Sequence, residues 1–131
     1  MKLIATYIAT LLVFVVVDMV WLGLIAKDFY RSSIGHLMGE GFNIPAAVAF
    51  YLIYTAGILM FAVNPAVASG DVMKAAMLGA AFGFFAYATY DLTNMATLKN
   101  WPLGITLADI AWGSVLTGLA ATAGYTVATR L

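Results

Sequence analysis

The chain has 131 residues, of which 64% are hydrophobic and 9% are charged. Its mean hydropathy of +0.99 is too high for a soluble domain, and its length allows about four membrane spans of about 20 residues. The lack of cysteine excludes disulfides, thiol nucleophiles and zinc sites built on sulfur, and six basic against six acidic residues provide no polybasic patch for nucleic acid. We therefore expect a single all-α domain over residues 1–131, a polytopic membrane protein whose partner is the lipid bilayer and not nucleic acid.

Four apolar stretches predict a four-helix transmembrane bundle, with helices over about 3–26, 45–63, 72–97 and 103–129. The first stretch is longer than the apolar core of a signal peptide and lacks a small-residue cleavage pattern, so we expect it to be retained. Asn64-Pro65 is expected to end the second helix. Asp71 is expected to cap the third, and Pro102 precedes the fourth. Four spans place both termini on the same side of the membrane.

The first loop, residues 27–44, has a helical periodicity of its own. Its apolar residues recur at helical spacing with polar residues between them, and they are Phe29, Tyr30, Ile34, Leu37 and Met38. This pattern predicts an amphipathic segment that lies in the membrane interface and ends at Gly39 and Gly41. An irregular polar loop is the alternative.

Three aspartates, Asp18, Asp91 and Asp109, lie inside the predicted spans. An ionised carboxylate at mid-bilayer costs about 2.5–3.5 kcal/mol on insertion scales, so each acid is a candidate functional group. At 1.5 Å per residue, the three lie about 9–12 Å below the same membrane surface. Small residues precede Asp91 and follow Asp109 at four-residue steps, which places both acids on packing faces. We therefore predict that the three carboxyls face one interior pocket.

Three arrangements would stabilise these carboxyls within the membrane. They could be protonated, they could bind a metal ion or another cation, with Asp18, Asp91 and Asp109 as candidate ligands, or they could accept hydrogen bonds. The expected donors and pocket neighbours are Trp21, Tyr90, Thr93, Asn94 and Trp112. An ion pair would require Lys27, Arg31 or Lys99 to reach down from a loop. The alternative for each acid is a hydrogen bond that only orients the helices.

Three loop residues are expected to emerge on the same side as the acids. His36 and Glu40 are four positions apart in the first loop, and Lys99 lies in the third. We interpret them as accessory residues that supply further ligands or carry protons.

Several short motifs together resemble a known family. They are Asp18-x-x-Trp21-Leu-Gly23, Gly35-His36-Leu37, Phe50-Tyr51, Tyr90-Asp91-Leu92-Thr93-Asn94-x-Ala96-Thr97 with Trp101-Pro102, and Asp109-x-x-Trp112-Gly113. Across essentially the whole chain they are similar to the bacterial membrane-protein family known as domain of unknown function 2177. The resemblance implies a small multi-pass protein of the bacterial inner (cytoplasmic) membrane. It implies no established activity, and the sequence leaves any cofactor unknown.

Three function classes stay open. In the first class, an aspartate-lined pocket within the membrane would bind a cation, a small molecule or a lipid. A role in transport would require a homo-oligomer, because four helices enclose little volume. A membrane enzyme acting on a lipid or another hydrophobic substrate would use the carboxyls as acid and base or as metal ligands. A structural or accessory subunit needs only the packing faces. The acids gather in one leaflet, which favours a binding site open to one side.

Overall fold

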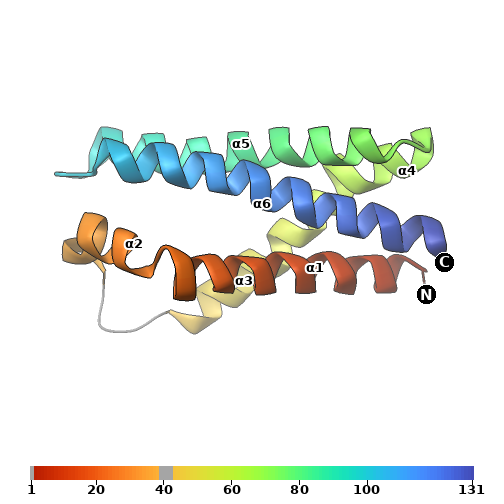
Figure 1. Ribbon diagram of the computed structural model, residues 1–131, viewed down its shortest axis with the longest axis horizontal. Coiled ribbons are helices and arrows are strands. Elements are labelled where there is room, and N and C mark those ends of the chain that lie inside the picture. The colour runs from red at the N-terminus through yellow and green to blue at the C-terminus, as the bar shows by residue number, and fades with distance from the viewer. Residues whose placement is uncertain (1, 39–42) are drawn as a thin grey trace.

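A computed structural model describes residues 2–38 and 43–131 (Figure 1). Its α-helices are α1 (Lys2–Val20), α2 (Lys27–Ile34), α3 (Ile44–Ile58), α4 (Asn64–Ser69), α5 (Val72–Thr97) and α6 (Leu103–Arg130). Wider π-helical turns occupy Trp21–Ile25 and Leu59–Val63, and a 3-10 turn occupies Gly35–Leu37. Four continuous helices are long and apolar enough to cross a membrane, namely Lys2–Ile25, Ile44–Ser69, Val72–Thr97 and Leu103–Arg130. The predicted all-α four-helix bundle is confirmed.

Local side-chain caps set several helix starts. The Asn43 carboxamide oxygen accepts a hydrogen bond from the Ala46 amide at 3.1 Å, which satisfies one of the free N–H groups at the start of α3. The Asp71 carboxylate accepts from the Met73 amide at 3.0 Å and caps α5, as the sequence predicts. Just before it, Gly70 has a left-handed φ of 66° and ends α4.

The expected end of the second span at Asn64-Pro65 is wrong. The helix continues through α4 to Ser69, after the π-helical turn over Leu59–Val63. A proline in a regular helix lacks a donor and clashes with the carbonyl one turn earlier. The wider turn before Pro65 relieves that conflict, so the chain bends instead of stopping.

Glycines bring α5 and α6 into close contact. A Cβ atom added at Gly79 would lie 2.7 Å from the Cβ of Ala121, and one added at Gly83 would lie 2.7 Å from the Thr117 hydroxyl oxygen. The Tyr87 ring fills the space where a side chain at Gly113 would lie. The four-residue stripes predicted from the sequence are therefore the contact faces of these two helices.

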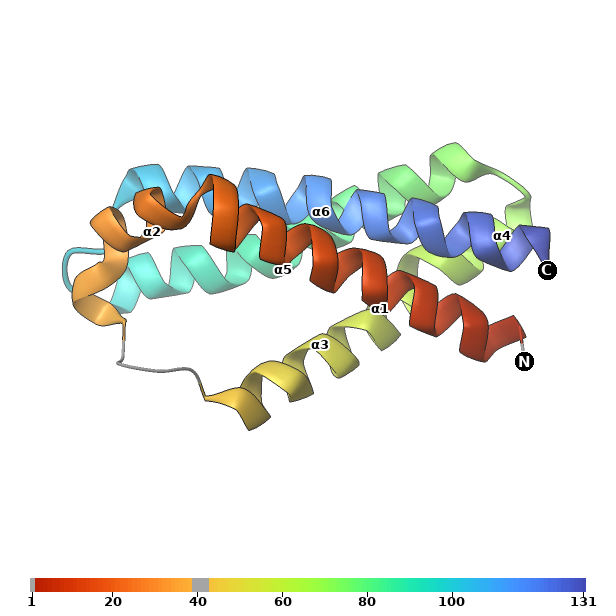
Figure 2. The same ribbon diagram turned by 60° about the horizontal axis from the view of Figure 1, so that its bottom comes forward.

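The core lies in the middle of the bundle and extends toward the end at which the two chain termini lie. Phe14 of α1, Ile58 of α3 and Leu116 of α6 are completely buried in it. The first turns of α3 diverge from α5 and α6, and α3 rejoins the bundle only toward its C-terminal end (Figure 2). At the end far from the termini, the backbone of α3 therefore lies farther from the other helices (Figure 2).

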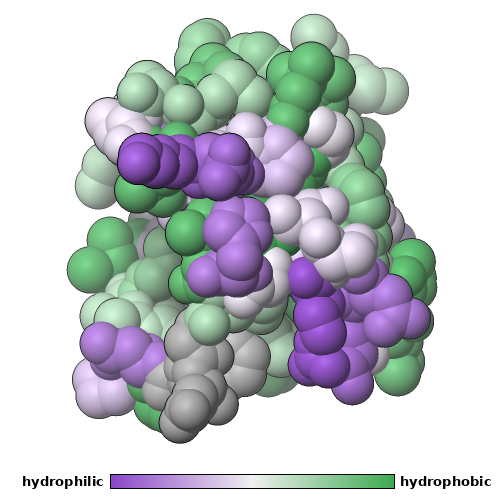
Figure 3. Space-filling view, turned by 90° about the vertical axis from the view of Figure 1, so that its left-hand side faces the viewer, coloured by the Kyte–Doolittle hydropathy of each residue, from purple (hydrophilic) through white to green (hydrophobic). Residues whose placement is uncertain are grey.

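Both chain termini lie at one end of the bundle, and α2 and the α5–α6 connection lie at the other (Figure 1). We call this second end the loop end. Hydrophilic residues gather there in the space-filling view and hydrophobic ones flank them, as expected for a membrane-water boundary (Figure 3). The start of the first loop, Lys27–Ile34, forms the helix α2 and not an irregular segment. Lys27 and Arg31 are exposed, whereas Tyr30 and Ile34 are half-buried. The predicted stops at Gly39 and Gly41 lie outside the described residues.

Candidate functional site

The three aspartates come from three different helices and lie toward the loop end. Asp18 is in α1 and 7% exposed, Asp91 is in α5 and completely buried, and Asp109 is in α6 and partly exposed. None of the three is turned fully outward, which agrees with the helical phase read from the sequence.

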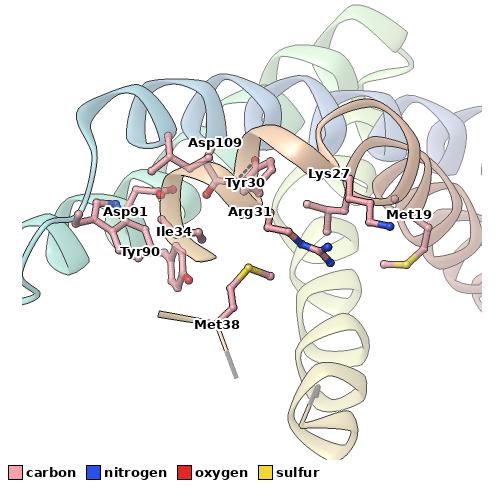
Figure 4. Close-up of a pocket in the computed structure, with 13 residues that line it drawn as sticks. Met19, Lys27, Tyr30, Arg31, Ile34, Met38, Tyr90, Asp91 and Asp109 are labelled. Atoms are coloured by element: carbon pink, nitrogen blue, oxygen red, sulfur yellow. Dashed lines mark hydrogen bonds between the residues drawn. The ribbon is translucent and has the colours of Figure 1, made fainter. Parts of the chain in front are cut away.

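The first cavity, of about 560 Å³, lies between α2 and the ends of α1, α5 and α6 (Figure 4). Its walls are mostly apolar, with two acids, Asp91 and Asp109, and two bases, Lys27 and Arg31. It is lined by Met19, Leu22, Gly23, Lys27, Tyr30, Arg31, Ile34, Met38, Tyr90, Asp91, Trp101, Ile105 and Asp109. A large apolar cavity with a few convergent polar groups is the usual form of a small-molecule site.

Two buried polar groups of this cavity lack hydrogen-bond partners among the described residues. They are both carboxyl oxygens of Asp91 and the indole N–H of Trp101. The Asp109 carboxyl lies beside that of Asp91 (Figure 4) and interacts with it electrostatically. Buried polar groups in folded proteins are nearly always satisfied, so the wall of this cavity contains a carboxyl and an indole N–H whose partners the described residues do not supply.

Asp109 is held by a residue of the first loop. The Tyr30 hydroxyl of α2 donates a hydrogen bond to Asp109 Oδ1 at 2.8 Å and accepts one from the Trp21 indole at 3.2 Å. Burial, together with the neighbouring Asp109 carboxylate, raises the pKa of Tyr30 above its ordinary value, so this hydroxyl keeps its proton. The Tyr30 contact fastens α2 to the start of α6 and closes one side of the cavity.

Asp18 has a different environment, because both of its oxygens are occupied. Tyr51 of α3 donates to Oδ2 at 2.9 Å, and the indole of Trp112 of α6 donates to Oδ1 at 3.1 Å. The Trp112 ring stacks on Trp21 with 4.4 Å between centroids. Asp18 therefore joins three helices through satisfied hydrogen bonds, as a structural acid does.

A second cavity of about 410 Å³ adjoins the first. It lies among α1, α3, α5 and α6 and is rich in aromatic rings. It is lined by Asp18, Leu22, Phe50, Tyr54, Ala86, Tyr87, Tyr90, Asp109 and Trp112. Leu22, Tyr90 and Asp109 line both cavities. The arrangement differs from the single pocket expected, because Asp18 lines only the second cavity and Asp91 only the first.

The other predicted site residues divide into two groups. Tyr90 lines both cavities, Trp21 reaches Asp109 only through Tyr30, and Trp112 bonds to Asp18. Thr93 is exposed and donates to backbone carbonyls of its own helix, and Asn94, His36 and Lys99 line neither of these two cavities. Glu40 lies outside the described residues.

Sequence reasoning missed several contributors. In the sequence, Tyr51 and Trp101 stood out only as parts of the family motifs, and Tyr30 only as an apolar position of the first loop. The helical periodicity of the first loop already placed Tyr30 and Ile34 on one face, and both residues line the first cavity. Lys27 and Arg31 reach the cavity, yet no ion pair forms within the described residues (Figure 4).

The acids are not gathered as a metal centre in the part of the chain that the structure describes. No three histidine, cysteine, aspartate or glutamate residues lie close enough there to hold a metal ion. The chemistry at hand is instead a carboxyl pair, Asp91 and Asp109, beside apolar walls, which suits an organic group that donates hydrogen bonds.

The fold and the cavities define a membrane protein with four candidate spans and buried acids near one end of its helical bundle. The chain belongs to the family described as predicted membrane protein (DUF2177), whose model matches residues 3–126. This finding confirms the resemblance noted in the sequence. No curated protein and no solved structure shows a significant match.

Proposed function

We propose that this protein binds a ligand with an ammonium head group in the first cavity, between the carboxyls of Asp91 and Asp109. The observation that carries the proposal is Asp91: its side chain is completely buried, and both of its oxygens lack a donor among the described residues. A buried acid without a partner is costly, and a bound ammonium supplies both the positive charge and the missing N–H donors.

The rest of the cavity supports an organic cation more than a metal ion. Two neighbouring carboxylates repel each other, and a cation between them relieves the repulsion. Metal ions such as Ca²⁺ require six to eight oxygen ligands, whereas the described residues offer this pair and mainly apolar walls. A primary ammonium on a carbon skeleton satisfies both the acids and the walls.

The unpaired indole N–H of Trp101 suggests that the ligand also carries an acceptor. An oxygen close to the ammonium would accept from Trp101 while the nitrogen donates to Asp91. Lys27 and Arg31 are exposed at the opposite side of the cavity and would bind an anionic group of the ligand or a lipid phosphate. Ethanolamine, with an ammonium and a hydroxyl two carbons apart, is the smallest probe with the required chemistry.

Equilibrium binding of radiolabelled ethanolamine to the purified protein in detergent tests the proposal. Asp91→Asn keeps the size of the side chain and removes its charge. Because a hydrogen bond to a charged group contributes about 1.5–3 kcal/mol, affinity should fall about ten- to hundredfold. Asp28→Asn is the matched control, since it removes an exposed carboxylate of α2 that lines neither cavity. Equal affinity of wild type and Asp91→Asn, or a loss of the same size in the control, would reject the proposal.

As part of this proposal we assign the protein to the inner membrane of a bacterium. The assignment is supported by the family resemblance alone. Fractionation of the native cells, with the protein recovered in the outer membrane, would contradict it.

A further inference from the structure

The two cavities differ in chemistry although they touch. The first contains the unpaired Asp91 and Trp101 groups, whereas aromatic rings dominate the second. Leu22, Tyr90 and Asp109 form parts of both walls, so the head-group site and the aromatic cavity are neighbours that meet at these side chains.

Part of the wall of the second cavity is exposed at the surface of the bundle. The first turns of α3 diverge from α5 in Figure 2, and Phe50 of α3, a wall residue, is 44% exposed. In a membrane, this side of the bundle faces lipid and not water. A chain leaving the head-group site through this cavity would therefore end among acyl chains.

We propose that the ligand is an amphiphile, with its ammonium head between Asp91 and Asp109 and its alkyl chain in the second cavity, leaving the protein between α3 and α5. The inference rests on the proposed function and adds the class of ligand to it. The rings of Phe50, Tyr54 and Tyr87 supply apolar contacts for methylene groups. The opening on the lipid side allows the ligand to enter and leave without crossing an aqueous phase.

Ala86 offers a direct test, because its small side chain lines the second cavity and not the first. In Ala86→Phe, a ring would fill the space assigned to the chain. Ala81→Phe is the matched control, since Ala81 is exposed on the same helix and lines neither cavity. Affinities would be measured for ethanolamine and for N-octylethanolamine, each in the same detergent, so that partition into micelles cancels between wild type and variant.

The expected result is selective. Ala86→Phe should bind ethanolamine as the wild type does and lose about tenfold or more in affinity for N-octylethanolamine, whereas Ala81→Phe should keep both affinities. Unchanged N-octylethanolamine binding by Ala86→Phe would overturn the chain path. Ethanolamine binding by the wild type, together with its loss in Asp91→Asn, would then leave the head-group proposal standing.

A second measurement uses the wild-type protein and does not depend on how the Ala86 variant folds. N-octylethanolamine with a photoreactive diazirine at the end of its chain would be irradiated in the complex, and the labelled peptides identified by mass spectrometry. Labels on α3 and α5 residues of the second cavity support the proposal. Labels confined to α2, or to the lipid-facing side of α1, would overturn it.

Discussion

Replacing Gly83 by alanine tests whether glycine contact holds α5 and α6 together. An added Cβ would lie 2.7 Å from the hydroxyl oxygen and 2.8 Å from the Cβ of Thr117, and it would overlap the carbonyl oxygen of Gly113. Carbon atoms pack best at about 3.5–4 Å, so the two helices would have to separate by about 1 Å. The obstructing carbonyl belongs to the backbone of α6 and cannot rotate away.

The size of the effect follows from two opposing terms. Overpacking a tight interface costs about 1–3 kcal/mol, whereas alanine is about 1 kcal/mol better than glycine within a helix. Because the obstructing atom belongs to the backbone, the cost should lie in the upper part of that range, about 2–3 kcal/mol, which leaves a net loss of about 1–2 kcal/mol in the free energy of unfolding of Gly83→Ala. Gly104→Ala is the control, because no atom lies within 4 Å of a Cβ added there. That variant should be as stable as the wild type or slightly more stable.

Reversible unfolding by SDS in mixed micelles, followed by circular dichroism, measures both variants on one scale. If Gly83→Ala were as stable as Gly104→Ala, the close approach of the two helices would not contribute as described. Because Asp109 lies one turn before Gly113 on α6, the Gly83 variant should also bind ethanolamine more weakly.

Three further predictions address the acids, α2 and the topology. Asp18→Asn should lower the free energy of unfolding by about 1–3 kcal/mol, because it disturbs the hydrogen bonds from Tyr51 and Trp112. Asp91→Asn should not lower it, because the Asp91 carboxyl has no such bonds among the described residues. A larger loss of stability for Asp91→Asn than for Asp18→Asn, measured by thermal unfolding in detergent, would contradict this assignment. An unfolded chain loses the Tyr30 proton near the ordinary pKa of 10, whereas the folded protein keeps it because the pKa is raised there. The free energy of unfolding should therefore fall above about pH 10 in the wild type, and it should fall less steeply in Tyr30→Phe. Equal slopes for the two proteins would argue against the buried hydroxyl. Reporters fused to the two termini should lie on the same side of the membrane, and opposite sides would refute the four-span topology.

The sequence by itself determined that the chain forms four long apolar helices and in which order, although it placed the end of the second helix too early. Backbone polar groups cannot remain unpaired in lipid, so a long apolar stretch must be helical. The four-residue stripes of small side chains identified the contact face of α5 and α6 for the same reason, because a helix repeats every 3.6 residues. These are local properties, and the family model over residues 3–126 agrees with the membrane assignment.

The tertiary structure decided which side chains meet the acids. Tyr30 is 79 positions from Asp109 and Tyr51 is 33 positions from Asp18, so neither partner follows from spacing within one helix. The π-helical turns shift the phase of α1 and of the second span, and that shift cannot be read from hydrophobic periodicity. Whether an acid is satisfied or unpaired depends on these distant contacts. For that reason three aspartates that look alike in the sequence become one structural acid, Asp18, and a pair, Asp91 and Asp109, beside a cavity.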